Sequence, residues 1–158
     1  MGRLSSRRLA DVEAIKQLKA RYFLYVDTKQ WGPLRALFTD DADFDSARIG
    51  EYQMDGPDDF ITYASRGLTG GISVHHGHMP IIEFTGKRTA KGLWAMMDYV
   101  QTPGDDGTFR GFVCYGHYHE EYRKVGDEWK IAKWAITRLR VDPLAADHAM
   151  DLQRRPAP

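Results

Sequence analysis

Residues 108–141 read TFRGFVCYGHYHEEYRKVGDEWKIAKWAITRLRV, and this stretch decides the fold class. It is rich in β-branched and aromatic residues, which favour strands. The Gly-Asp dipeptide at 126–127 is typical of a two-residue hairpin turn. The stretch therefore predicts two long antiparallel strands, Thr108–Val125 and Glu128–Val141, joined by a tight turn.

Two more segments of the same kind come directly before this hairpin, at Val74–Thr85 and Thr89–Thr102. Glycine-containing turns at 86–88 and 103–107 separate the segments. Four long strands in succession, joined by short turns, predict an antiparallel meander. A shorter strand is expected earlier, at Ala42–Ser46.

The first part of the chain has a helical pattern. From about Ala10 to Gln30, apolar residues recur every three or four positions, with Lys16, Lys19 and Arg21 between them and Asp11 as a plausible N-cap. A short helix is expected from Pro33 to Phe38, ending at Asp40-Asp41, and another at Pro57–Leu68. Helices followed by a run of strands predict an α+β domain whose helices cover one face of the sheet.

The length and charge of the chain bound its organisation and partners. Its 158 residues fit one domain, 1–158, with loose ends expected at about 1–8 and 144–158. Twenty-two basic residues balance 22 acidic ones, which argues against nucleic-acid and anionic-membrane partners. The single cysteine, Cys114, suits a reducing compartment, and we find no secretory signal and no bilayer-spanning run. We expect a cytoplasmic protein.

Two charged residues lie in strands that are otherwise apolar. Asp98 and Arg138 share strand faces with residues expected to point inward, namely Trp94, Met96, Val100, Trp134 and Ile136. A buried charge is costly unless it is paired. The two residues could form a structural ion pair, or they could bind a ligand, and the pattern leaves both interpretations open.

Five of the six histidines fall in two strand clusters: His75, His76 and His78, then His117 and His119. Pairs of the form His-x-His on strands can bind a metal, as in cupin-like barrels. The helical first third argues against such a barrel, and no third and fourth ligand accompany the pairs. We therefore expect neither a metal nor another cofactor.

Several stretches resemble the SnoaL-like, NTF2-like superfamily. They are RYFLYVDTKQWGPLRALFTDDADFD, HHGHMPIIEF, GLWAMMDYV, GHYHEEYRKVGDEWKIAKW and TRLRVD, and together they cover about residues 9–142. The resemblance implies an NTF2-like cone, in which a curved antiparallel sheet wraps around N-terminal helices. Many functions share this fold, so the local motifs carry the functional argument.

The segment VDTKQW resembles the part of scytalone dehydratases that carries a catalytic aspartate, and the first histidine of HHGH matches their catalytic histidine. The chain departs from that family at Val26, where a tyrosine is expected, and it has no histidine at the next strand's catalytic position. It resembles the bacterial bile-acid 7α-dehydratases more closely. That resemblance implies catalytic roles for Tyr22, Asp27, His75, Asp98 and Arg138.

The resemblance implies a cofactor-independent dehydratase, a lyase, in which His75 is the general base, Asp27 supports it and Tyr22 donates to an oxygen. We expect a hydrophobic hydroxy-carbonyl substrate of steroid-like, terpenoid or polyketide type. Its apolar wall would comprise Phe23, Trp94, Met96, Tyr115 and Trp134. A ketosteroid-type isomerase, a polyketide cyclase and a non-catalytic binding module are the alternatives. Relatives also suggest a homodimer or homotrimer that forms through the outer face of the sheet.

Overall fold

The computed structural model describes residues 5–44, 54–104 and 107–144. In chain order the elements are α1 (Ser6–Asp27), α2 (Trp31–Arg35), β1 (Phe38–Phe44), α3 (Gly56–Leu68), β2 (Ile72–Phe84), β3 (Thr89–Pro103), β4 (Phe109–Val125) and β5 (Glu128–Pro143). The strands form one curved sheet in the order β1-β5-β4-β3-β2. The expected α+β fold is confirmed.

The sheet is mixed, not purely antiparallel. Strands β2 to β5 form the expected meander, with each neighbour antiparallel. Strand β1 adds to the free edge of β5 in the parallel direction. It begins at Phe38, so Asp40 and Asp41 lie inside this strand and do not end the preceding helix.

The first helix begins earlier than its apolar pattern indicates. Ser5 is the N-cap and accepts a hydrogen bond from the Arg8 backbone N–H at 3.3 Å. Asp11, expected to be the N-cap, is buried one turn inside the helix. Its carboxylate accepts hydrogen bonds from Lys124 and Trp129, each at 2.9 Å. Loose ends were expected at about 1–8 and 144–158, and residues 1–4 and 145–158 of these ends lie outside the described residues. So does Ser46, the last residue of the expected short strand.

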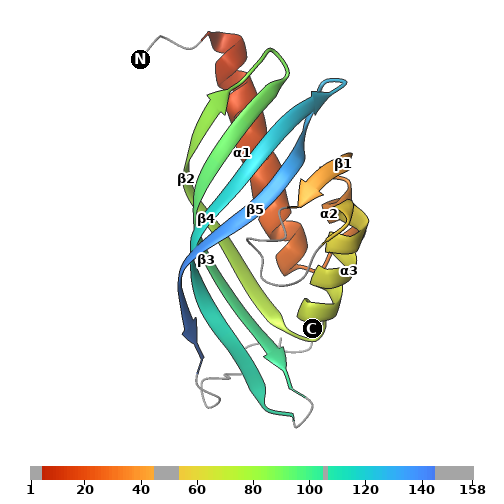
Figure 1. Ribbon diagram of the computed structural model, residues 1–158, viewed down its shortest axis with the longest axis vertical. Helices are drawn as coiled ribbons and strands as arrows, with labels where there is room; N and C mark the ends of the chain where they lie inside the picture. Colours follow the sequence, from red (N-terminus) through yellow and green to blue (C-terminus); the bar gives the residue numbers. More distant parts are fainter. Residues whose placement is uncertain (1–4, 45–53, 105–106, 145–158) are drawn as a thin grey trace, which may run out of the picture.

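Helix α1 runs along the concave face of the sheet, while α2, α3 and β1 gather at one side (Figure 1). Its buried stripe contains Ile15, Leu18, Tyr22 and Val26, which pack into the hydrophobic core. This packing leaves space between α3 and the sheet, and the candidate site lies there. No helix among the described residues has the length and apolar character required to cross a membrane.

Lys19 is one of the basic residues that lie between the apolar positions of the helical pattern. It is completely buried, and its Nζ lies 2.5 Å from Glu120 Oε1 on β4. Burial lowers the pKa of Lys19, whereas the Glu120 carboxylate acts in the opposite direction. The ammonium group also lies 3.6 Å from the centre of the Tyr118 ring. The helix is therefore joined to the sheet by a buried ion pair.

We predict that Lys19→Met lowers the free energy of unfolding by about 3–5 kcal/mol, because Glu120 is left as a buried charge without its counterion. Adding Glu120→Gln should recover most of this loss, since the amide is neutral and still accepts from Tyr122. Urea unfolding measures both, with exposed Lys16→Met as the control. A double variant as unstable as the single one would contradict this explanation.

Candidate active site

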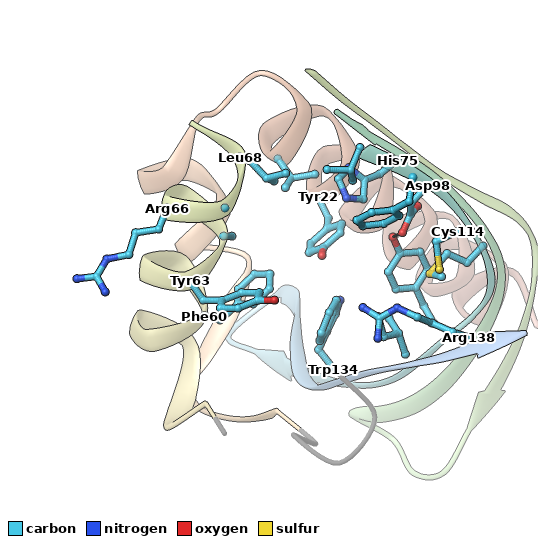
Figure 2. Close-up of a pocket in the computed structure, with 18 residues that line it drawn as sticks. Tyr22, Phe60, Tyr63, Arg66, Leu68, His75, Asp98, Cys114, Trp134 and Arg138 are labelled. Atoms are coloured by element: carbon cyan, nitrogen blue, oxygen red, sulfur yellow. Dashed lines mark hydrogen bonds between the residues drawn. The ribbon is translucent and has the colours of Figure 1, made fainter. Parts of the chain in front are cut away.

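A cavity of about 560 Å³ lies between α1, α3 and the concave face of the sheet (Figure 2). Most of its wall is apolar or aromatic and includes Val26, Phe60, Leu68, Phe112 and Ile136. Its polar groups come from Tyr22, Tyr63, His75, Asp98, Cys114, Tyr118, Trp134 and Arg138, whereas the guanidinium of Arg66 points away from the cavity (Figure 2). Such a cavity suits a mostly apolar ligand that carries a few oxygen atoms.

Asp27 and His75 are in direct contact at the cavity wall. Asp27 ends helix α1, and its Oδ1 lies 2.6 Å from His75 Nδ1. Its Oδ2 accepts the backbone N–H of His75 at 2.9 Å. The carboxylate favours the tautomer in which Nδ1 carries the proton, so Nε2 is the nitrogen that can accept one from a ligand.

Further contacts hold Asp27 in place. Ser73 on β2 donates a hydrogen bond to Asp27 Oδ1 at 3.0 Å and accepts one from Lys29 Nζ at 2.7 Å. Lys29 has a positive φ of 60°, which turns the chain after the helix and brings its side chain back toward β2. These bonds offset the unfavourable position of an acid at a helix C-terminus.

Tyr22 lies on the buried face of α1, and its hydroxyl points into the cavity (Figure 2). Burial, followed by the carboxylates of Glu120 and Asp98, raises the pKa of Tyr22 well above its usual range. The hydroxyl therefore stays protonated at neutral pH. It can act as a hydrogen-bond donor toward an oxygen of the ligand.

Asp98 is buried on β3 and has only one satisfied oxygen. Its Oδ2 accepts a hydrogen bond from the Tyr118 hydroxyl at 2.6 Å, whereas Oδ1 is buried with no partner among the described residues. Burial raises the pKa of Asp98, and His75 in its protonated form, the Tyr118 hydroxyl, Lys19 and the backbone N–H of His76 lower it in part. This environment favours a protonated carboxyl group.

Arg138 enters the cavity from β5, near Cys114 on β4 (Figure 2). Burial raises the pKa of the Cys114 thiol, and the guanidinium of Arg138 opposes that effect. Within the described part of the chain, no ion pair joins Arg138 to Asp98. The structure therefore does not contain the structural pair that the sequence left open, and the guanidinium faces the ligand space.

Only two of the five residues expected to form the apolar wall line the cavity. Met96 and Trp134 line the cavity, whereas Phe23, Trp94 and Tyr115 are not among its lining residues. Tyr115 alternates with Cys114 on β4 and so faces the convex side of the sheet. Phe23 and Trp94 lie beside Gly77, where both rings would contact an added Cβ atom.

Helix α3 supplies a wall that the sequence analysis did not assign. Phe60, Tyr63, Ala64, Gly67 and Leu68 line the cavity from this helix. Their spacing of three and four residues is the pattern of one helix face, so amphipathicity was the signal available. Tyr118 was also missed, although it is four residues from Cys114 and so shares the inner face of β4 with it.

Among the described residues, the other histidines do not line this cavity. The rings of His76 and His78 stack with their centres 6.2 Å apart, and those of His117 and His119 lie 6.3 Å apart. Residues 5–44, 54–104 and 107–144 contain no group of three or more His, Cys, Asp or Glu side chains able to hold a metal ion. Hydroxyl and imidazole groups, with Asp98 and Arg138, therefore supply the chemistry that the cavity can offer.

We predict that Asp98→Asn stabilises the protein relative to the wild type increasingly as pH rises from about 4 to about 7. A carboxyl whose folded-state pKa is raised contributes stability below its unfolded pKa and loses it as pH passes the folded pKa. Asparagine does not ionise and escapes this loss. Urea unfolding across that range measures the difference between the two proteins.

The matched control is Asp58→Asn, because Arg35 lowers the pKa of the exposed Asp58. Its stabilising contribution is present above the unfolded pKa, so this variant should lose stability relative to the wild type at neutral pH. Parallel pH profiles for wild type and Asp98→Asn would show that burial does not act on Asp98 as described.

Comparison with known proteins identifies the family to which this chain belongs. The SnoaL-like domain model matches residues 7–135. The FGR4 protein of Gibberella zeae, named a probable cyclase, is 25% identical over an alignment 134 residues long that covers 79% of this chain and 89% of that protein.

Solved structures share the fold. A scytalone dehydratase-like protein of Novosphingobium aromaticivorans superposes with a TM-score of 0.78 at 17% identity, covering 90% of this chain and 93% of its own. A hexachlorocyclohexane dehydrochlorinase, LinA type 2, has a TM-score of 0.78 at 23% identity, covering 92% and 97%. With the family model matched over most of its length, this chain belongs to the SnoaL-like domain family, within the NTF2-like superfamily.

Proposed function

We propose that this protein is a dehydratase that removes water from a hydrophobic hydroxy-carbonyl compound. The observation that carries the proposal is the His75–Asp27 contact of 2.6 Å at the wall of a largely apolar cavity. A neutral imidazole that is oriented by a carboxylate is a general base suited to neutral pH. The apolar wall suits a steroid-like, terpenoid or polyketide substrate.

In the proposed reaction His75 Nε2 takes a proton from the carbon next to the carbonyl group. Asp27 stabilises the imidazolium that forms, because its carboxylate already bonds Nδ1. The electron pair of the broken C–H bond moves onto the carbonyl oxygen as an enolate. Tyr22 and Arg138 face the cavity as donors for that oxygen.

The enolate then forms the carbon–carbon double bond and the C–O bond to the hydroxyl breaks. The leaving hydroxide takes a proton from Asp98, whose raised pKa favours the protonated form. The proton held by His75 returns to Asp98 through the released water. One water is lost, and no oxidant or reductant is consumed.

The names of the similar proteins support elimination chemistry. A dehydratase removes water and a dehydrochlorinase removes hydrogen chloride, and each name describes loss of a proton and a leaving group. Cyclisation is the second candidate, because the FGR4 protein is named a probable cyclase. Both reactions can begin with removal of a proton beside a carbonyl group.

The test is a panel of fused-ring hydroxy ketones, each paired with the ketone that lacks the hydroxyl group. Mass spectrometry detects loss of water from the first set. In deuterated water it detects deuterium uptake next to the carbonyl in the second set. Water loss with uptake supports the dehydratase, uptake with rearrangement alone supports an isomerase or cyclase, and binding without either supports a binding module.

We predict that His75→Gln lowers turnover by about 10²–10⁴-fold, the usual contribution of general acid–base catalysis. Asp27→Asn should lower it by a similar or smaller factor, since the base remains but its orientation and charge stabilisation weaken. Steady-state kinetics with thermal unfolding of each variant provides the measurement. A correctly folded His75→Gln protein with near-wild-type turnover would remove the base from the mechanism.

Tyr22→Phe should reduce kcat by roughly 10²–10³-fold, the range typical for loss of one oxyanion donor. The substitution keeps the ring and its edge-on contacts with Phe38 and Tyr118, with centres 6.2 Å apart in each case. Stability should therefore change little. Tyr25→Phe on the same helix is the control, because Tyr25 does not line the cavity.

A further inference from the structure

Two polar atoms in the cavity wall are buried without a partner. Among the described residues, four side-chain atoms have this property: Arg8 Nη1, Thr39 Oγ1, Asp98 Oδ1 and Trp134 Nε1. Only the last two belong to residues that line the cavity. Buried polar atoms in proteins are nearly always hydrogen-bonded, so an exception at a ligand cavity indicates a bond made by the ligand.

The indole N–H groups of two other buried tryptophans have hydrogen-bond acceptors, unlike that of Trp134. Trp94 donates to the Tyr122 hydroxyl at 2.8 Å, and Trp129 donates to Asp11 at 2.9 Å. The fold therefore satisfies buried indole groups where no ligand can reach them. Trp134 is just as buried, with 5% of its surface exposed, and its N–H has no acceptor at full hydrogen-bond geometry. It lies close enough to the Tyr22 hydroxyl to oppose, in part, the rise in the pKa of Tyr22, so the two groups are neighbours in the cavity wall.

Packing holds the Trp134 ring firmly. Phe60, Tyr118 and Phe44 surround it, with ring centres 5.2, 6.1 and 5.9 Å away. Its nitrogen points to the middle of the cavity, toward the hydroxyl of Tyr22 (Figure 2). A rigid donor with a fixed direction needs no reorganisation when charge develops on a ligand oxygen.

We infer that Trp134 Nε1–H and the Tyr22 hydroxyl form a donor pair that binds one oxygen of the ligand, a conjugated carbonyl that becomes an enolate. The inference rests on the proposed function and assigns Trp134 a catalytic role that its apolar character conceals. The enolate of a conjugated carbonyl is planar, so the ligand is flat around this oxygen.

The experiment uses the intact protein and a series of substituted 2-naphthols, which mimic a flat enolate and differ in acidity. Ligand absorbance distinguishes bound naphthol from bound naphtholate and gives the affinity of each compound. In the wild type, affinity should rise steeply with naphthol acidity. Naphthalene, which lacks the oxygen, reports the packing contribution alone.

The key variant replaces Trp134 by 3-benzothienylalanine, in which sulfur takes the place of the N–H and the ring size is kept. It should bind the most acidic naphthol roughly ten- to a hundredfold more weakly, the range for a hydrogen bond to a charged group. Naphthalene binding should stay unchanged. Trp129→Phe, which removes an N–H outside the cavity, should retain the wild-type dependence on acidity.

Equal naphtholate affinity in the wild type and the benzothienyl variant would overturn the inference. So would an equal loss for naphthalene and the naphthols, because packing would then explain the effect. If His75→Gln retains turnover while the Trp134 effect persists, the proposed reaction fails and the donor pair stands. If His75→Gln abolishes turnover and the Trp134 effect is absent, the proposed reaction stands and the donor pair fails.

Discussion

The site depends on how helix α1 is fixed to the sheet. Three polar residues on this helix, Asp11, Lys19 and Asp27, follow one another at intervals of eight positions, over about 24 Å of helix. The first bonds strands β4 and β5, the second β4, and the third β2. Apolar packing tolerates sliding, whereas hydrogen bonds at three points do not. The helix register thereby brings Tyr22 to the cavity and Asp27 to His75, which lines it.

The cavity separates two kinds of groups. His75, Asp27 and Asp98, which can exchange protons, come from the end of α1 and from β2 and β3, whereas the donors Trp134 and Arg138 come from β5. With His75 on β2 and the guanidinium on β5, one cavity offers both a proton acceptor and donors for a negative oxygen.

The sequence predicted the elements that have a clear period or turn signal. The Gly-Asp turn and the alternating strands located the meander within a few residues, and the motif resemblance named Asp27 and His75, which proved to be in contact. It could not predict the parallel pairing of β1 with β5, since the residues of a short strand do not specify which strand it pairs with or in which direction. It also could not predict the burial of Lys19, because a lysine is ordinarily exposed and the fold alone brings Glu120 opposite it.

Trp134 was assigned to an apolar wall because a tryptophan contributes to packing mainly through the size of its ring. Whether its N–H is used depends on which acceptors the fold brings near, and here Trp94 and Trp129 find them in Tyr122 and Asp11. The unpartnered nitrogen of Trp134 is thus a property of three-dimensional neighbours. A buried donor without an acceptor costs free energy, and an oxygen of the ligand offsets this cost when it accepts from Trp134.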